Sequence, residues 1–326
     1  MNIQLLKDLC SVYGPTSYEE TVAEFILNDI KDYIDDFKFD RLGNLIVHKK
    51  GQGRKMMLAG HMDQFGLLVT DINKDGFLYF APLGGISPEN LITQRVIFKN
   101  GIIGIVNCER IGNNFKMTLD KMYIDIGARN KDDAEKYVSV GDVCVFHTIP
   151  LIDNNKIISP ALDDRSGCFI MMEALKRIKN SAFDLYFAFT VQKEVGTKTS
   201  AYSVEPDYGI VFDVTASFDT PKAKKLPSKM YGGAAIKLKD SSFLCHPTMV
   251  KHFEKCAKEA NINYQFEILE TGDMHSDAIH ISYGDVPSGV ISIPARNLHS
   301  ASEMCALSDI SDCIELAVKV LEMEIS

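Results

Sequence analysis

A short apolar run that ends in charge is the feature that most limits how this chain can fold. Residues 185–189 are apolar and rich in aromatic side chains, and the following residues, 190–196, include Lys193 and Glu194. The run is short and lacks Gly and Pro, which predicts a buried strand rather than a loop. In an open α/β sheet, ligands bind outside the carboxyl ends of the strands. Glu194 therefore lies where such a fold places a binding site.

Other potential metal ligands occupy similar positions along the chain. Two further apolar runs end at such a residue, one histidine follows a run in a loop, and one aspartate begins a helical pattern. Each of these alone is more often a helix cap or a core hydrogen-bonding residue. If the strands are parallel neighbours, their carboxyl ends converge, and the residues form one set of two histidines and three carboxylates: His61, Asp163, Glu194, Asp213 and His299. Such a set suits zinc, cobalt or manganese.

The size of this set indicates what it can do. Five protein ligands exceed what one catalytic ion binds while it keeps an open position, but they suit two ions about 3.5 to 4 Å apart, bridged by a carboxylate. Such a pair activates a water and polarises a carbonyl oxygen, which predicts hydrolysis, with a nearby carboxylate as general base. Asp163 and Glu194 also permit the carboxylate pair of a glycoside hydrolase, although the accompanying histidines favour metal.

The rest of the sequence predicts an α/β domain with an insertion. Ser17 and Glu20 have the spacing of a capping box ahead of a helix that ends near residue 32, and a last helix is expected over about 308–323. Between these helices, residues 67–156 contain short apolar runs separated by Gly- and Asn-containing turns, which predicts a β-rich barrel or sandwich. We therefore predict a central, mostly parallel sheet flanked by helices, formed by residues 1–66 and 157–326 and interrupted by the β-rich domain.

Composition limits the classes of partner. The 326 residues include 35 basic and 44 acidic side chains, so the net charge is −9, which disfavours nucleic-acid or anionic-membrane partners. The one dense basic patch, residues 222–229, is read as a solvated loop. No stretch approaches the roughly 18 apolar residues of a membrane span and no signal peptide is recognisable, so the cytoplasm is the default location. The eight scattered cysteines lack a Cys-x-x-Cys pair and are expected to be reduced.

Five segments of the chain resemble, in order, the motifs of one enzyme family. They are residues 60–66, 161–165, 192–196, 212–221 and 289–300, and they are similar to those of the glutamyl aminopeptidase and tetrahedral (TET) aminopeptidase family, which has also been labelled as endoglucanase. The resemblance covers nearly the whole chain. It implies a metallo-exopeptidase fold, removal of N-terminal residues from short peptides, and a large hollow homo-oligomer such as a dodecamer. It also implies that residues 67–156 form a dimerisation domain.

The resemblance assigns a role to each matching residue. His61, Asp163 and Asp213 would bind one metal ion, and Glu194 and His299 would bind a second ion, with Asp163 bridging the two; zinc or cobalt is expected. Asp63 would orient His61 through a hydrogen bond, and Asp164 would help to hold the bridging geometry. His275 and Asp277 would line the substrate cleft, although a polar helix start explains them equally well.

The sequence departs from the family pattern at three places. Lys193 stands where the family has the glutamate that serves as general base, Gln64 stands where it usually has Glu, and the segment 197–201 is shorter. Two nearby dications would lower the pKa of Lys193, which makes a neutral, proton-accepting lysine conceivable. We therefore expect an aminopeptidase that is impaired or altered. The alternative is a metal-binding homologue without peptidase activity that acts as an assembly or binding subunit.

Overall fold

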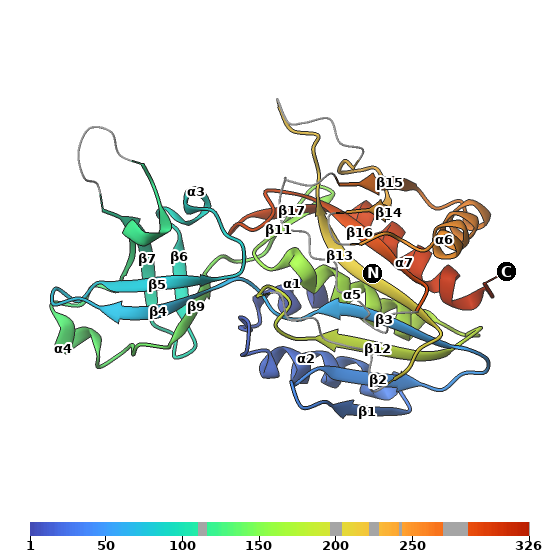
Figure 1. The fold of residues 1–326 in the computed structure, drawn as a ribbon, viewed down its shortest axis with the longest axis horizontal. Coiled ribbons are helices and arrows are strands. Elements are labelled where there is room, and N and C mark those ends of the chain that lie inside the picture. Colours follow the sequence, from blue (N-terminus) through green and yellow to red (C-terminus); the bar gives the residue numbers. More distant parts are fainter. Residues whose placement is uncertain (110–115, 196–203, 222–227, 241–242, 270–285, 326) are drawn as a thin grey trace.

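The protein consists of a large α/β body and a smaller barrel that lies beside it (Figure 1). The structure, a computed structural model, describes residues 1–109, 116–195, 204–221, 228–240, 243–269 and 286–325. The chain enters the barrel after β3 and leaves it before β10, so the barrel is an insertion between two parts of the α/β body.

An 11-stranded sheet forms the centre of the α/β body. Its four middle strands, in the order β12, β3, β13 and β16, are parallel, whereas the described flanking pairs are antiparallel except for β14 with β15. The parallel centre confirms the predicted fold class, and the sheet as a whole is mixed. The strands, from one edge, are β1 (Asp36–Phe39), β2 (Leu45–Lys49), β12 (Asp184–Thr190), β3 (Lys55–His61), β13 (Tyr208–Ala216), β16 (Ser288–Arg296), β17 (Glu303–Ala306), β11 (Lys156–Ser159) and β10 (Leu151–Asp153), with β14 (Ala234–Lys239) and β15 (Tyr264–Ile268) attached to β16.

The five long helices of the described residues contribute to one large core on a single face of the sheet. Helix α5 is buried along most of its length, contacting β3 and β13 on one side and α1 and α7 on others, which explains why its sequence is apolar nearly all round. The opposite face of the central strands carries a smaller apolar cluster around Met57 and Val211. The helices are α1 (Ile3–Ser11), α2 (Glu20–Ile30), α5 (Leu162–Arg177), α6 (Pro247–Ala260) and α7 (Leu307–Glu322).

The inserted region is a closed antiparallel barrel with its own core, as the alternation of short apolar runs and turns predicts. Around the barrel the strands are β4 (Gly66–Ile72), β5 (Leu78–Leu83), β8 (Met122–Asp125), β7 (Ile103–Cys108), β6 (Arg95–Phe98) and β9 (Val143–Phe146), with the short helices α3 (Pro88–Leu91) and α4 (Lys131–Ala134) between them. Closure removes free strand edges, so a small β domain of this kind is stable against unwanted pairing.

One local prediction is wrong. Ser17 has a φ of 71° and does not cap α2, whose N-cap position is occupied by Glu19 without a side-chain hydrogen bond. The carboxylate of Glu19 is buried and accepts hydrogen bonds from the backbone N–H groups of Ser17 and Gln192 instead. The capping box fails because Ser17 has a left-handed backbone, and its hydroxyl accepts a hydrogen bond from the side-chain amide of Gln192 in the loop after β12.

Two further expectations concern the cysteines and membrane-spanning helices. All eight cysteines are buried and free, as expected for reduced thiols. Within the residues that the structure describes, every helix is too short or too polar to span a lipid bilayer.

Arg165 joins the N-terminal segment to the centre of the fold. Its guanidinium is fully buried on α5 and donates hydrogen bonds to the carbonyl oxygens of Met62, Leu9 and Gly14. Met62 follows β3, Leu9 lies in the last turn of α1 and Gly14 lies in the connection to α2, so one side chain satisfies backbone groups from two separate segments. Buried carbonyl groups that lose their donors cost free energy.

We expect Arg165→Met to lower the free energy of unfolding by about 3 kcal/mol, because several buried carbonyl groups would lose their partners. Urea-induced unfolding followed by circular dichroism measures the change. Arg177→Met on the same helix is the matched control: Arg177 is 30% exposed and pairs with Glu173 and Glu315, so its loss should cost less than about 1 kcal/mol. Equal effects of the two substitutions would contradict the role given to Arg165.

Candidate metal centre

Three of the five predicted ligands gather at the carboxyl side of the parallel strands. Potential ligand atoms of His61, Asp163 and Asp213 all lie within 4.8 Å of one another, and all three side chains are buried. Nε2 of His61 lies 3.0 Å from Oδ1 of Asp163 and 3.8 Å from Oε1 of Glu194. Nε2 of His299 lies 3.4 Å from the other Asp163 oxygen, Oδ2. The structure therefore brings together all five residues, with Asp163 between the two histidines.

The ends of the central strands place these side chains. His61 is the last residue of β3, and β12 aligns Thr190 opposite it, so the chain that follows β12 turns beside His61. Gln192, in that turn, has a φ of 59°. Asp213 differs from the expectation, because it lies within β13 rather than at its end: pairing with β16 continues through Thr215 and Ala216.

Asp63 connects the end of β3 to the turn after β12. Its Oδ1 accepts a hydrogen bond from the backbone N–H of Lys193 (3.1 Å) and lies 3.2 Å from Nδ1 of His61. Its Oδ2 accepts hydrogen bonds from the N–H of Glu194 (3.0 Å) and the hydroxyl of Thr16 (2.8 Å). The buried carboxylate thus orients the imidazole, and it also positions the backbone of Lys193 and Glu194.

Asp164 combines two structural tasks. Its Oδ1 accepts a hydrogen bond from the N–H of Gly167, which caps the regular part of α5, and its Oδ2 accepts one from the N–H of His61. Asp163 and Asp164 themselves have non-helical backbone angles, and the peptide bond between them is cis. A Cβ at position 167 would lie 2.2 Å from Oδ1 of Asp164, so this contact requires glycine. Asp164 therefore caps the helix and also holds the backbone of His61.

Glu303, at the start of β17, is a site residue that sequence reasoning missed. Its buried carboxylate accepts hydrogen bonds from the N–H of Asp163 (3.0 Å) and the N–H of His299 (2.9 Å), so it holds the backbone of two candidate ligands. Burial and the nearby Asp163 raise the pKa of Glu303 to about 8. No motif surrounds it in the sequence, and its only signal is an acidic side chain at the start of an apolar strand.

The barrel side of the molecule fixes the second histidine. Nδ1 of His299 lies 2.8 Å from the carbonyl oxygen of Gly85, and the side-chain amide of Asn90 donates a hydrogen bond to the His299 carbonyl. The ring of Phe65 lies against the imidazole, with 4.4 Å between centroids. A proton on Nδ1 that is shared with Gly85 leaves Nε2 as the ring nitrogen able to bind a metal ion.

Unpartnered oxygen atoms test whether the residues fit a metal ion. Oε1 of Glu194 and Oδ2 of Asp213 are buried without a hydrogen-bond partner. A buried carboxylate oxygen without a partner is costly, and a divalent cation satisfies it. Both atoms belong to the predicted ligand set, and imidazole with carboxylate is a donor set for zinc and similar ions. The residues present therefore fit the predicted group.

The protonation of the histidines bears on this fit. Burial and Lys193 lower the pKa of His61, but Asp163 and Asp63 raise it more, so its pKa lies well above the usual range. Burial lowers the pKa of His299, but the nearby Asp163 raises it by more, to about 9. Since a metal ion binds only neutral imidazole, binding would release protons from both rings.

Lys193 lies inside the cluster. It is 8% exposed, and its Nζ lies 3.6 Å from Oδ1 of Asp213 and 3.9 Å from Oδ1 of Asp163. Burial lowers the pKa of Lys193, but Asp163 and Asp213 raise it by more, so in the metal-free arrangement its pKa lies well above the usual range. The side chain there is an ammonium group, which cannot accept a proton.

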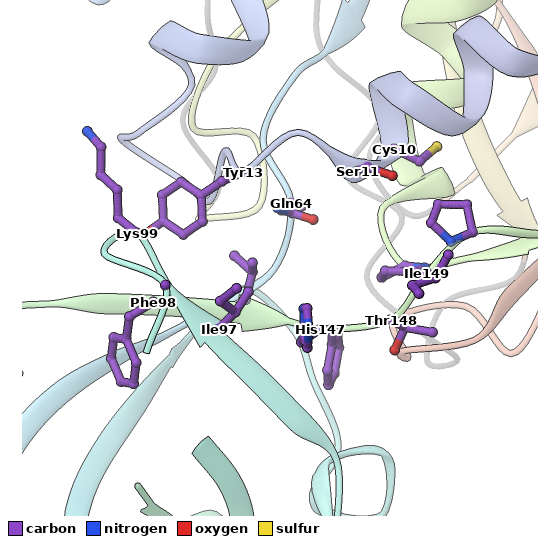
Figure 2. Close-up of a pocket in the computed structure, with 15 residues that line it drawn as sticks. Cys10, Ser11, Tyr13, Gln64, Ile97, Phe98, Lys99, His147, Thr148 and Ile149 are labelled. Atoms are coloured by element: carbon purple, nitrogen blue, oxygen red, sulfur yellow. The ribbon is translucent and has the colours of Figure 1, made fainter. Parts of the chain in front are cut away.

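The other sequence expectations lie elsewhere. His275, Asp277 and the segment 197–201 are outside the described residues, as is most of the basic patch at 222–229. Gln64 lines a separate cavity of about 310 Å³ at the junction of the barrel and the α/β body, together with Tyr13 and His147 (Figure 2). Its backbone N–H donates to the carbonyl oxygen of Gly14. Gln64, which departs from the family pattern, therefore lines the junction cavity.

Comparison with known proteins identifies relatives over the whole chain. A protein named "Putative aminopeptidase" from Acetivibrio thermocellus is 46% identical over 321 residues, which are 97% of each chain. Among solved structures, an aminopeptidase from the archaeon Desulfurococcus kamchatkensis is 32% identical, with a TM-score of 0.93 over 99% of this chain and 95% of that one. The TET1 peptidase of Pyrococcus horikoshii, which can assemble into a tetrahedron or a large octahedral shell, is 28% identical, with a TM-score of 0.85 over 98% of each chain.

A family model agrees with these relatives and with the resemblance seen in the sequence motifs. The model of the M42 glutamyl aminopeptidases matches residues 43–316, which include all five candidate ligands and the inserted barrel. With this match and with relatives that extend along nearly its full length, the chain belongs to the M42 family of glutamyl aminopeptidases.

Proposed function

We propose that the chain is a metal-dependent aminopeptidase that removes N-terminal residues from short peptides. The observation that carries the proposal is the buried group of His61, Asp163 and Asp213, whose ligand atoms converge within 4.8 Å in a member of an aminopeptidase family. The unpartnered oxygens of Asp213 and Glu194 support a cation at this place. The alternative, a binding or assembly subunit without activity, is less favoured because the relatives carry aminopeptidase names.

The same five residues would hold two divalent ions, zinc or cobalt. His61, Asp163 and Asp213 would hold one, and Glu194 and His299 would hold the other, with Asp163 contributing to both. When bound, the ions supply Lewis acidity toward a carbonyl oxygen and lower the pKa of a water molecule. Asp63 and Gly85 hold the Nδ1 atoms of the two histidines, which keeps each Nε2 directed at the centre.

Proton transfer is the weak step of this enzyme. The position from which a carboxylate would take a proton from water is occupied by Lys193, an ammonium in the metal-free arrangement. Removing a positioned base typically lowers a rate by about 100 to 10,000-fold. Lys193 can replace that base only when bound ions lower its pKa enough to make it neutral. We therefore propose a slow or altered aminopeptidase.

The barrel supports a proposal about assembly. Ile103 and Ile105 on β7 alternate with buried residues and are 48% and 47% exposed, which leaves two large apolar side chains on the outer surface of a small domain. Exposed apolar side chains that cluster often mark contacts with other chains. Together with the assemblies formed by the Pyrococcus horikoshii relative, they support a homo-oligomer in which the barrel is the dimerisation domain. The dodecamer and the cytoplasmic location stay predictions.

We expect metal-free protein that is re-equilibrated with excess Zn²⁺ or Co²⁺ to bind about two ions per chain and to gain hydrolysis of aminoacyl-chromophore substrates. Elemental analysis gives the metal content. Asp213→Asn should lower both the metal content and the rate, because it weakens a ligand. Asp184→Asn, at the opposite end of β12, is the control and should change neither. Protein that takes up no metal under these conditions would rule out the proposed ligand set.

With saturating metal, Lys193→Glu should raise the rate of aminoacyl-substrate hydrolysis at least about tenfold, because a carboxylate is restored at the position of the base. Steady-state kinetics on a panel of aminoacyl and short-peptide substrates measures the change. Lys255→Glu, an exposed position on α6, controls for the change in net charge. An unchanged rate in metal-loaded Lys193→Glu protein would place the base elsewhere.

Replacing both exposed isoleucines of β7, as in the double variant Ile103→Lys and Ile105→Lys, should reduce the particle mass measured by light scattering, because charge would replace an apolar contact. Circular dichroism should be unchanged, since neither side chain belongs to the barrel core. Leu42→Lys, an exposed apolar position in the α/β body, is the control. A particle of unchanged mass would mean that this surface of the barrel is not an oligomer contact.

A further inference from the structure

We infer that the ammonium of Lys193 competes with one of the two divalent ions for the carboxylates of Asp163 and Asp213. As a result, the two ions bind with unequal affinity. The inference rests on the proposed function, because it concerns the ions of that same site. It adds a role for Lys193 that is separate from any part in proton transfer.

The backbone around Lys193 directs its side chain into the cluster. Asp63 accepts hydrogen bonds from the N–H groups of both Lys193 and Glu194, and Glu19 accepts one from Gln192, so three consecutive residues are held by buried or nearly buried carboxylates. The Lys193 side chain is itself almost fully buried, which leaves little room for the ammonium to reach solvent. A lysine fixed in this way remains within the cluster.

The contacts of the ammonium coincide with those of one predicted ion. Nζ lies within 4 Å of Oδ1 of Asp213 and Oδ1 of Asp163, and these two residues, with His61, form the group whose ligand atoms converge. A divalent ion among the three would share two carboxylates with Nζ. Like charges a few ångströms apart repel strongly in a buried site, where solvent and salt screen them weakly. This ion can bind only if the ammonium is displaced or the repulsion is overcome.

The second predicted ion is less affected. His299 approaches Asp163 at Oδ2, on the opposite oxygen from the one that Lys193 contacts, and Glu194 contributes an oxygen that has no hydrogen-bond partner. An ion bound there would use the Asp163 oxygen that the ammonium does not contact, together with an imidazole whose Nδ1 faces Gly85. We therefore assign the tighter site to Glu194 and His299 with Asp163, and the weaker site to His61, Asp163 and Asp213.

Titration of the metal-free full-length chain with Zn²⁺ or Co²⁺, followed by calorimetry and by the Co²⁺ absorption spectrum, tests the assignment. The wild-type chain should bind one ion tightly and a second at least about tenfold more weakly, which corresponds to about 1.4 kcal/mol. Lys193→Met, which keeps the length of the side chain but removes its charge, should tighten the weak site at least tenfold. Lys255→Met, on the exposed surface of α6, should leave both constants unchanged. Lys193→Gln serves for the same titration if the methionine variant does not fold.

The outcomes separate this inference from the proposed function. Two ions of equal affinity in the wild-type chain, or a weak site that is unchanged in the uncharged variants, would overturn the inference, while metal-dependent hydrolysis would still support the proposed function. A wild-type chain that binds no ion and hydrolyses no aminoacyl substrate would overturn the proposed function itself. Because Lys193→Met supplies no base, a tightened weak site without a recovered rate would identify the metal effect of Lys193 apart from catalysis.

Discussion

The geometry of the centre depends on one buried carboxylate, that of Asp63. It accepts hydrogen bonds from the backbone of Lys193 and Glu194 and lies beside Nδ1 of His61, so it connects the ends of β3 and β12. Parallel pairing brings the two strand ends to the same edge of the sheet, but it does not fix the turn that follows β12. Without Asp63 the positions of Lys193 and Glu194 relative to His61 would not be fixed. A site whose side chains must be placed to within about 0.5 Å would then be lost.

The buried acidic groups around the centre need hydrogen bonds that stabilise them. Glu303 and Asp164 are buried beside Asp163, and burial raises the pKa of both. Their stabilisation comes from backbone N–H groups, those of Asp163 and His299 for Glu303 and those of His61 and Gly167 for Asp164. Each bond also orients the backbone of a candidate ligand or its helix. The groups that hold the centre in place are therefore the same ones that make its charge tolerable.

The sequence predicts the candidate ligands better than it predicts the residues that hold them in place. His61 and Glu194 follow recognisable strands, and Asp163 begins a helix, so local patterns and parallel pairing are enough to bring them together. The carboxylates of Glu303 and Glu19 act through hydrogen bonds to residues that are distant in sequence or in another element, and no periodicity signals such contacts. The same holds for Gly85 and Asn90, which reach His299 from the inserted barrel. Long-range hydrogen bonds also explain why the capping box at Ser17 does not form.

Lys193 changes the balance between folding and metal binding. A site with a glutamate at this position would place one more carboxylate beside Asp163, Asp213 and Glu194, and without metal these groups would repel one another or take up protons. An ammonium among them lowers that repulsion, so the metal-free centre of this chain is compatible with a fully packed interior. The same charge opposes one of the ions that the ligands are suited to hold. A residue that lowers the repulsion among these carboxylates must therefore also weaken metal binding, because both effects arise from one charge at one place.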